Sequence, residues 1–324
     1  MGFLDTILRP LEIVVADIMV VWHYLLTFIG IPSASGAAWG LSIVGLVVTI
    51  RIILIPLFVK QIKSSRAMQM IAPELKAVQA KYKGKKDSAS REAMSRETME
   101  LYSKHKTNPF ASCLPMLVQA PIFFALFRVL NYKLKAGPDG VFAGIGWLTP
   151  KLAEQADSAT IFGAPISAAF LRADGNIHVQ IVATVLIVMM VSTTFLTQRQ
   201  LTQKNMPASA LEGPMAQQQK VLMYILPFIF VISGPNFPIG VLIYWTTTNL
   251  WTMGQQFYVI RRNPTPGSDA DKAYKARLAA KAAKKGLPLI DSSDPKHLVI
   301  EAGESTDVSR QREQPNKKKP KKKR

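Results

Sequence analysis

The stretch Trp39–Val59 (WGLSIVGLVVTIRIILIPLFV) decides the class of fold, because its twenty-one residues carry a single charge, that of Arg51. About 20 apolar residues in a helix match the hydrocarbon thickness of a bilayer, so this stretch is predicted to span a membrane. An arginine near the middle of a span costs roughly 2.5–3.5 kcal/mol on insertion scales. We therefore expect Arg51 to face a polar, water-containing groove. Alternatively its side chain snorkels to the headgroups, although eight residues separate it from Lys60, where the polar region begins.

Four further apolar runs predict spans at about residues 110–130, 178–196, 221–235 and 237–258. The last two are joined by GPNFP, a Gly/Pro turn with no room for a domain. Prolines inside such runs are tolerated in membrane helices, because neighbouring groups satisfy the freed carbonyls. We predict an all-α polytopic membrane protein whose five-helix transmembrane core occupies residues 36–262.

The N-terminal segment, residues 1–35, contains an apolar stretch at 11–31 that also carries Glu12, Asp17 and His23. At helical spacing most of its apolar side chains share one face, whereas Glu12 and His23 lie on another. That asymmetry is typical of a helix lying in the membrane interface, so we expect an interfacial helix. A sixth span is the alternative, because the stretch is long enough to cross.

Lysine and arginine counts set the orientation. The segments 60–109, 131–177 and 197–220 hold twelve, four and three of these residues, and residues 262–324 hold seventeen. Alternating spans put the first, third and last groups on one side, and basic residues are enriched on the cytoplasmic side of membrane proteins. We therefore expect these three segments in the cytoplasm and the segment 131–177 outside.

The segment 60–109 is predicted to fold as a cytoplasmic hairpin of two antiparallel helices. Residues 62–83 and 88–105 each carry apolar side chains at helical spacing, and Gly84–Asp87 (GKKD) is a turn signal between them. Because a connection needs only a few residues, we expect this hairpin to dock a partner. The alternative is a solvated hairpin that only connects two spans.

Residues 263–324 form a low-complexity basic tail that we expect to be disordered. From Arg261 onward the sequence holds eighteen basic and eight acidic residues. Such runs bind polyanions through counterion release, so RNA and anionic lipid are both candidate partners. Alternatively the tail only supplies positive charge on the inner side. The closing basic cluster is the candidate ribosome-binding set: Lys317, Lys318, Lys319, Lys321, Lys322, Lys323 and Arg324.

The sequence predicts no enzyme. The chain has 48% hydrophobic residues and a net charge of +19, but a single cysteine, Cys113, and four scattered histidines. Nucleotide-binding loops, nucleophile–base arrangements and metal-ligand spacings are absent from the sequence, so we expect no catalytic residue, no metal, no cofactor and no small-molecule substrate. The N-terminus lacks the order of a secretory signal, so the mature chain is expected to begin at or near Met1.

These features resemble the YidC-type membrane protein insertases, the family that includes the mitochondrial Oxa and chloroplast Alb proteins. The matching stretches are RIILIPL (Arg51–Leu57), NPFASCLPMLVQAPIFFALFRVL (Asn108–Leu130) and NFPIGVLIYWTTTNLWTMGQQFYVIRR (Asn236–Arg262), followed by the basic end. Together with the hairpin, the resemblance covers about residues 7–262. IFGAPISAAF in the outer segment is similar to the actinobacterial branch.

The resemblance implies an insertase and chaperone of the bacterial cell membrane, acting alone or with the Sec translocon and without nucleotide hydrolysis. Arg51 would supply the charge of a hydrophilic groove open to the cytoplasm and the lipid. Gln119, Tyr244 and Trp245 would line or flank the groove, although each could instead pack between helices. The implied partners are nascent membrane proteins, the lipid bilayer and the ribosome, bound by the tail and the hairpin.

One departure and two alternative functions accompany this resemblance. Where some relatives have a threonine that faces the substrate, this chain has Val47, with Thr49 two residues before Arg51. A small-anion transporter or channel could use Arg51 as its anion site, but it would need further ionisable residues within the membrane. A membrane tether for ribosomes or RNA would instead depend entirely on the basic tail.

Overall fold

The computed structural model describes residues 3–85, 87–105, 107, 114–134, 136, 140–206 and 214–284, and most of them are helical. The helices are α1 (Phe3–Phe28), α2 (Gly36–Ile53), α3 (Ile55–Met70), α4 (Ala72–Lys81), α5 (Ser88–Lys104), α6 (Leu114–Arg128), α7 (Pro150–Ser158), α8 (Ile177–Arg199), α9 (Pro214–Ser233), α10 (Ile239–Arg262) and α11 (Asp269–Lys284). Two short strands, β1 (Thr160–Ile161) and β2 (Ala164–Pro165), form one antiparallel pair. The predicted all-α class is confirmed.

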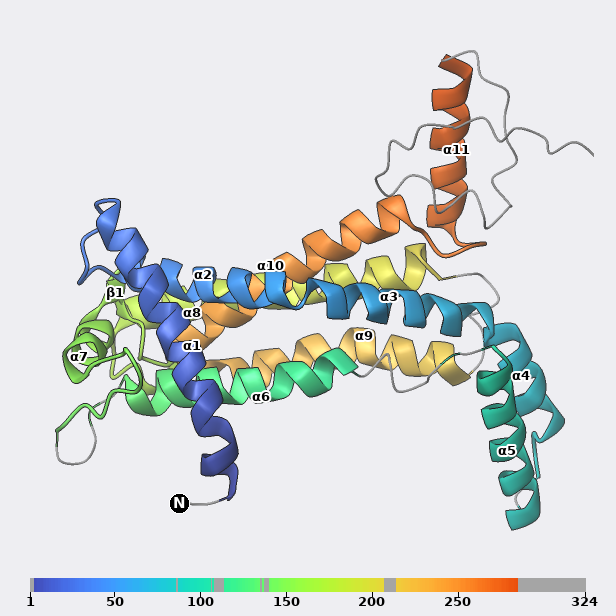
Figure 1. Ribbon diagram of the computed structural model, residues 1–324, viewed down its shortest axis with the longest axis horizontal. Helices are drawn as coiled ribbons and strands as arrows, with labels where there is room; N and C mark the ends of the chain where they lie inside the picture. Colours follow the sequence, from blue (N-terminus) through green and yellow to red (C-terminus); the bar gives the residue numbers. More distant parts are fainter. Residues whose placement is uncertain are drawn as a thin grey trace, which may run out of the picture. The chain divides into compact units, whose positions relative to one another are not determined.

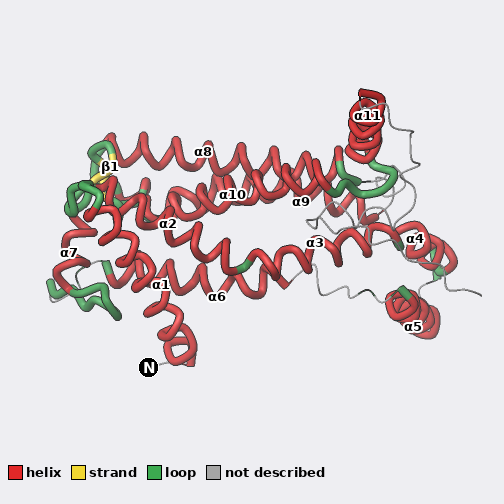
Figure 2. The backbone as a smooth tube through the Cα atoms, turned by 45° about the horizontal axis from the view of Figure 1, so that its top comes forward, coloured by secondary structure: helices red, strands yellow, loops and turns green. Residues whose placement is uncertain are grey.

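A common direction is shared by α2, α6, α8, α9 and α10, and α3 continues the direction of α2 (Figures 1 and 2). The predicted spans overlap these helices, but α2 ends at Ile53 rather than at 59 and α9 begins at Pro214 rather than at 221. The helix α10 packs along both α8 and α2, and α9 packs on α8. Among the described helices, three stretches are by themselves long and apolar enough to cross a bilayer: Thr6–Phe28, Gly36–Ile53 and Ile177–Lys204.

The first predicted span is divided in the structure, because α2 ends at Ile53 and α3 begins at Ile55. Pro56 lies in the first turn of α3 and has no N–H with which to continue the hydrogen bonding of α2, so the helix is interrupted before it. The amide of Leu54 donates to the carbonyl of Ile50 at 3.0 Å and closes the last turn. Arg51 therefore lies in the final turn of α2, next to the interruption.

The helix α1 runs obliquely across the bundle and packs on α2 and α6 (Figure 1). Its polar face points inward, since Glu12 and His23 are only 3% and 1% exposed, whereas Val14 and Leu25 on the opposite side are 53% and 50% exposed. In lipid, apolar side chains are already solvated and polar ones need partners within the protein, which explains this arrangement. Close packing on α2 requires Gly45, where a Cβ atom would lie 2.3 Å from the ring of Trp22.

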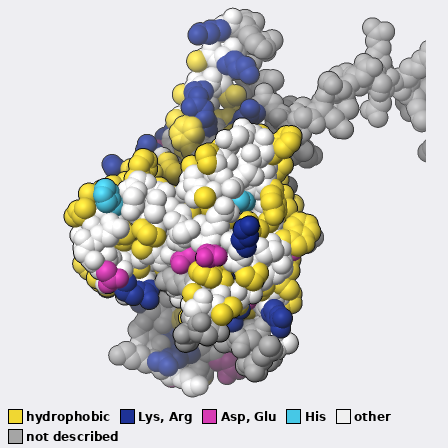
Figure 3. All heavy atoms as spheres, turned by 90° about the vertical axis from the view of Figure 1, so that its left-hand side faces the viewer, with side chains coloured by type: hydrophobic (Ala, Val, Ile, Leu, Met, Phe, Trp, Pro, Cys, Tyr) yellow, Lys and Arg dark blue, Asp and Glu magenta, His cyan; other side chains and the backbone are white. Residues whose placement is uncertain are grey.

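The segment that follows α6 covers one end of the bundle with α7, β1 and β2. Two of its carbonyls satisfy amides at the start of α10: Ile166 accepts from Gly240 and Ala168 accepts from Ile239, both at 2.9 Å. These amides would otherwise lack partners in the first turn of the helix. Figure 3 views the end that carries α7 and β1, where charged side chains of both signs lie among hydrophobic and uncharged ones.

The predicted hairpin is present as α4 and α5, which lie side by side beyond α3 (Figures 1 and 2). Its first arm is shorter than predicted, because α3 extends from the first span to Met70 and α4 begins only at Ala72. Leu75 and Val78 are buried, in agreement with the predicted apolar stripe. Glu97 of α5 ties the arms together: its carboxylate accepts hydrogen bonds from Lys81 Nζ at 2.9 Å and Tyr82 Oη at 3.0 Å.

The expectation of disorder from residue 263 onward is wrong for residues 263–284. This stretch includes α11, because alanine, lysine and arginine favour helices and acidic residues occupy its first turn. Before the helix, the amide of Thr265 donates to Asn205 Oδ1 at 3.0 Å. The chain divides into two compact units, 1–274 and 275–324. The predicted ribosome-binding cluster at 317–324 lies outside the described residues.

Candidate functional site

The structure encloses Arg51 between helices. Its side chain is 7% exposed, and its guanidinium lies over the ring of Phe58 on α3, 5.1 Å from the ring centre. Among the residues that the structure describes, no acidic side chain forms an ion pair with Arg51. A buried guanidinium has five N–H donors and cannot be deprotonated, so this position can attract an acidic group or hold water.

Two of the other predicted groove residues contact each other beside Arg51. Gln119 of α6 donates a hydrogen bond from Nε2 to the hydroxyl of Tyr244 on α10. Tyr244 is 2% exposed, and its phenol interacts electrostatically with Arg51. The Oε1 atom of Gln119 is buried without a hydrogen-bond partner. Because an unpaired buried acceptor is costly, this atom is suited to accept a hydrogen bond from water or from a passing polar group.

Trp245 has a different environment. Its indole stacks on Phe123 with ring centres 5.1 Å apart and an angle of 7° between planes, and it meets Phe237 edge-on at 4.7 Å. Phe230 of α9 completes the contact at 5.6 Å. This cluster joins α6, α9 and α10. Trp245 therefore packs between helices, which is one of the two roles that the sequence left open for this residue.

Val47, which departs from the family pattern, and the nearby Thr49 both pack away from Arg51. Val47 is buried at 1% exposure in the core shared by α1, α2, α6 and α10. Thr49 points to α1, where its Oγ1 accepts a hydrogen bond from Trp22 Nε1 at 2.9 Å. Neither residue adds a polar group next to Arg51.

Exposed apolar side chains follow α6 and α9. Leu117 and Phe124 on α6 are more than half exposed, as are Tyr224, Phe228 and Ile232 on α9. Their spacing of seven and of four residues places the members of each set on one helix face. In a bilayer these faces contact hydrocarbon, so the elements that carry Gln119 and Phe230 present lipid-soluble surfaces on their outer sides.

Sequence reasoning missed one charged pair within the bundle. Arg128 at the end of α6 donates from Nε to the carboxylate of Glu12 on α1. The two side chains were found separately in apolar runs, one in the N-terminal stretch and one in a predicted span. Ionisable residues within membrane segments usually pair with one another, and this rule could have predicted the pairing of Glu12 with Arg128.

These features define a polytopic helical membrane protein with an enclosed arginine next to a tyrosine and a glutamine. The sequence matches the family described as 60Kd inner membrane protein over residues 30–266. A protein of Streptomyces avermitilis named membrane protein insertase YidC is 50% identical over 254 residues, which cover 75% of this chain and 56% of that protein. One of the same name from Tropheryma whipplei strain Twist is 40% identical over 291 residues, covering 87% and 92%.

The chain therefore belongs to the 60Kd inner membrane protein family, which its curated relatives represent as membrane protein insertases YidC. It spans 56% of the length of the Streptomyces relative. Among solved structures, that of an active YidC insertase with its first transmembrane domain resolved matches with a TM-score of 0.47 and 20% identity, over 80% of this chain and 47% of that one. The family membership rests on the sequence matches alone.

Proposed function

We propose that the protein moves hydrophobic segments of newly made proteins from the cytoplasm into the lipid bilayer, through a hydrophilic groove that contains Arg51. The observation that carries this proposal is the enclosed guanidinium, which has no acidic partner among the described residues and lies beside the Tyr244 hydroxyl and the free Gln119 acceptor. A cation kept inside a membrane protein without a counterion is costly, and that cost indicates a functional role.

The mechanism is physical rather than chemical. Two opposite charges 4 Å apart attract by about 4 kcal/mol at an effective dielectric constant of 20. Arg51 thus attracts the acidic flank of an incoming segment, and the polar groups around it lower the cost of moving that flank into the hydrocarbon layer. The apolar part of the segment then leaves sideways into lipid, along the exposed faces of α6 and α9.

The orientation and the partners are part of the same proposal. The hairpin α4–α5 and the tail face the cytoplasm, where the ribosome supplies the substrates, and the Sec translocon is a partner for part of them. The outer segment with α7, residues 131–177, holds only four of the 40 lysines and arginines of the chain, as expected outside the cell. We keep the interfacial course for α1, which crosses the other long helices obliquely (Figure 1), with the sixth span as the alternative because Thr6–Phe28 is long and apolar enough to cross.

A small-anion transporter is the second candidate, and it is less well supported. A permeation path for anions would need more than one available cation within the membrane. In the part of the chain that the structure describes, Arg128 also reaches the bundle interior, but it is paired with Glu12. Arg51 alone can attract a flank, but it cannot form a chain of anion sites.

Reconstitution tests the proposed function directly. The full-length protein is placed alone in vesicles, and a short substrate with one apolar segment and an acidic flank is added without any nucleotide. We expect the flank to become protected from external protease. Protection that requires ATP, or none above protein-free vesicles, would contradict the proposal. Uptake of radioactive chloride or phosphate, measured in the same vesicles, identifies the transporter alternative.

A further inference from the structure

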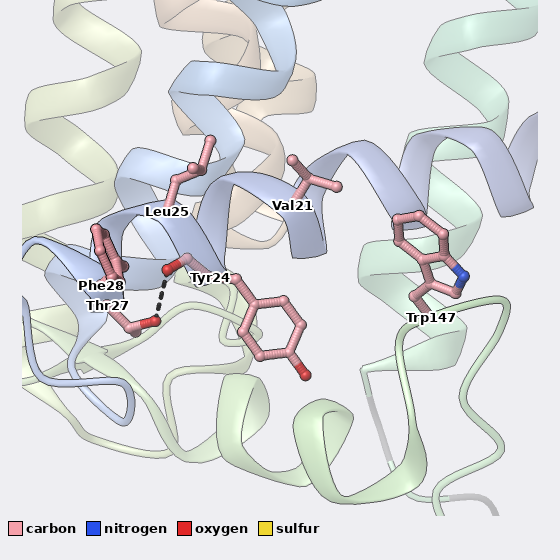
Figure 4. Close-up of a pocket in the computed structure, with 6 residues that line it drawn as sticks. All are labelled: Val21, Tyr24, Leu25, Thr27, Phe28 and Trp147. Atoms are coloured by element: carbon pink, nitrogen blue, oxygen red, sulfur yellow. Dashed lines mark hydrogen bonds between the residues drawn. The ribbon is translucent and has the colours of Figure 1, made fainter.

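An open cavity of about 620 Å³ lies at the C-terminal end of α1, and none of the residues that line it contributes to the site around Arg51. Its lining is predominantly apolar and consists of Val21, Tyr24, Leu25, Thr27, Phe28 and Trp147 (Figure 4). Five of these residues come from the last two turns of α1, and Trp147 comes from the outer segment. Ligand pockets in proteins commonly have volumes of about 300–1,000 Å³, so this cavity is large enough to hold part of a lipid.

The position of Trp147 is fixed by the backbone. Its amide donates to Asp17 Oδ1 on α1 at 2.6 Å. The preceding residue, Gly146, has a φ of +55°, and a Cβ atom there would lie 2.3 Å from the same carboxylate oxygen. A side chain at Gly146 would therefore push the loop away from α1. These contacts hold the backbone of Trp147 beside α1, so this wall of the cavity has a defined place in the fold.

The chemistry of the lining favours an apolar ligand. Thr27 Oγ1 donates to the carbonyl of Tyr24 at 2.9 Å, so this hydroxyl is already satisfied within the helix (Figure 4). The lining contains no charged side chain. Leu25 and Phe28 are 50% and 89% exposed, which leaves large apolar areas open on the outer side of the cavity.

The surroundings identify the occupant. The exposed apolar face of α1 continues from the cavity through Val14 to Ile7, both at least half exposed. Because the chain belongs to a family of membrane proteins, this face contacts hydrocarbon, and the cavity is continuous with it. Tyrosine and tryptophan are enriched where the hydrocarbon meets the headgroups, with the ring in the apolar layer and the polar atom toward water.

We propose that this cavity binds one acyl chain of a phospholipid, with Tyr24 and Trp147 at the level of its headgroup. The apolar chain fills the space between α1 and the indole, and the Tyr24 hydroxyl and the Trp147 N–H face the polar layer. The bound lipid fastens the end of α1 to the bilayer. This site does not depend on the proposed insertase activity, since it requires only that the protein resides in a membrane.

Photocrosslinking in vesicles tests the site. A diazirine-bearing amino acid replaces Leu25 in the full-length chain, and in a second protein it replaces Val14, which is equally exposed on the same helix but outside the cavity. Vesicles of phosphatidylethanolamine and phosphatidylglycerol are irradiated, and the adducts are identified by mass. We expect a several-fold higher yield of phospholipid adduct at position 25 than at position 14.

Three variants make the result specific. Trp147→Ala removes one wall and should lower the yield at position 25 to that at position 14, whereas Trp147→Phe should retain most of it. Val21→Trp fills the cavity and should have the same effect as Trp147→Ala without removing a contact of the outer segment. Equal yields at positions 25 and 14 in all of these proteins would show ordinary lipid contact and overturn the proposal. An adduct with the mass of a second copy or of another protein would also overturn it.

Discussion

Glu12 of α1 and Arg128 of α6 form an ion pair inside the bundle, and this pair links the N-terminal helix to the helix that carries Gln119. The Glu12 side chain is 4% exposed and that of Arg128 is 32% exposed, so the carboxylate depends on this partner much more than the guanidinium does. A buried carboxylate without a cation is strongly destabilising. The pair therefore fixes how α1 lies against the core.

Removing Arg128 should destabilise the protein more than removing both partners. We expect Arg128→Met to lower the free energy of unfolding by about 3 kcal/mol, at the low end for a broken buried pair because Arg128 is partly exposed. The double variant Glu12→Gln/Arg128→Met should recover part of this loss. Thermal unfolding in detergent measures all four proteins of the cycle. Losses that simply add would show that the two residues do not interact.

Replacing Arg51 should separate charge from packing. If attraction of acidic flanks is its role, Arg51→Lys should retain most insertion and Arg51→Ala should reduce it roughly tenfold, equivalent to about 1.4 kcal/mol. The matched control is a substrate whose flank is neutral, for which the two variants should differ little. Vesicle protease protection gives both rates. An alanine variant that inserts acidic-flanked substrates as fast as the wild type would refute the electrostatic role.

The sequence was sufficient to predict the helical class and the approximate places of α2, α6, α8, α9 and α10 along the chain, because runs of about twenty apolar residues have few alternatives to a helix. It also brought Arg51, Gln119 and Tyr244 into one candidate site through the family resemblance, and the structure places these three together. The interruption at Leu54 was missed, although Pro56 two residues later is its local cause.

Other features depend on contacts that one sequence does not reveal. The periodicity of α1 separates its two faces, but it does not say which face is inside when the solvent is lipid. The partners of Glu12 and Thr49, which are Arg128 and Trp22, decide this. The order of residues 263–284 was missed because a composition typical of disorder is, in this stretch, also a helix-forming one.

Cysteine labelling should establish the orientation. In a protein whose Cys113 is replaced by serine, a cysteine at Ser158 on α7 should react with a membrane-impermeant maleimide added to whole cells. A cysteine at Ser88, at the start of α5, should react only after the membrane is opened. Both positions are exposed, so access alone determines the result. The reverse pattern would invert the proposed direction of insertion.

The hairpin should lose protection as the pH falls. The hydrogen bond from Lys81 holds the pKa of the Glu97 carboxyl below its ordinary value of 4.5, and the backbone N–H of Ser90 lowers the pKa of Asp87 below 3.8. Because these carboxyl groups have lower pKa values in the folded hairpin than in the unfolded chain, their ionisation stabilises the folded hairpin at any pH above the unfolded pKa values. This stabilisation is lost as the pH falls through the folded pKa values. The ion pair with Glu97 raises the pKa of Lys81, so its contribution is complete below 10.5 and is lost above the raised value.

Hydrogen exchange of residues 72–104 in the full-length protein, corrected for the intrinsic rate, measures this effect. We expect protection to be constant between about pH 6 and 9 and to decrease below about pH 4. Glu97→Gln should lower protection at pH 7 and flatten the profile. Unchanged protection at pH 7 in this variant would assign the contact between the arms to apolar packing of Leu75 and Val78 instead.

The basic end of the chain should carry much of the affinity for the ribosome. Binding through phosphate contacts weakens as salt rises, with a slope proportional to the number of contacts, about 0.7 per phosphate for single strands. Replacing the seven basic residues at 317–324 by glutamine keeps the length of the chain and should flatten this slope in co-sedimentation measurements.

Truncation after residue 284 should flatten the salt slope similarly and leave the contact of Thr265 with Asn205 intact. Insertion of a short substrate added after its synthesis should be unaffected in both proteins, because the surroundings of Arg51 are unchanged. Ribosome binding with an unaltered salt slope would transfer the docking role to the hairpin α4–α5, whose lysines Lys83 and Lys85 are exposed at the turn.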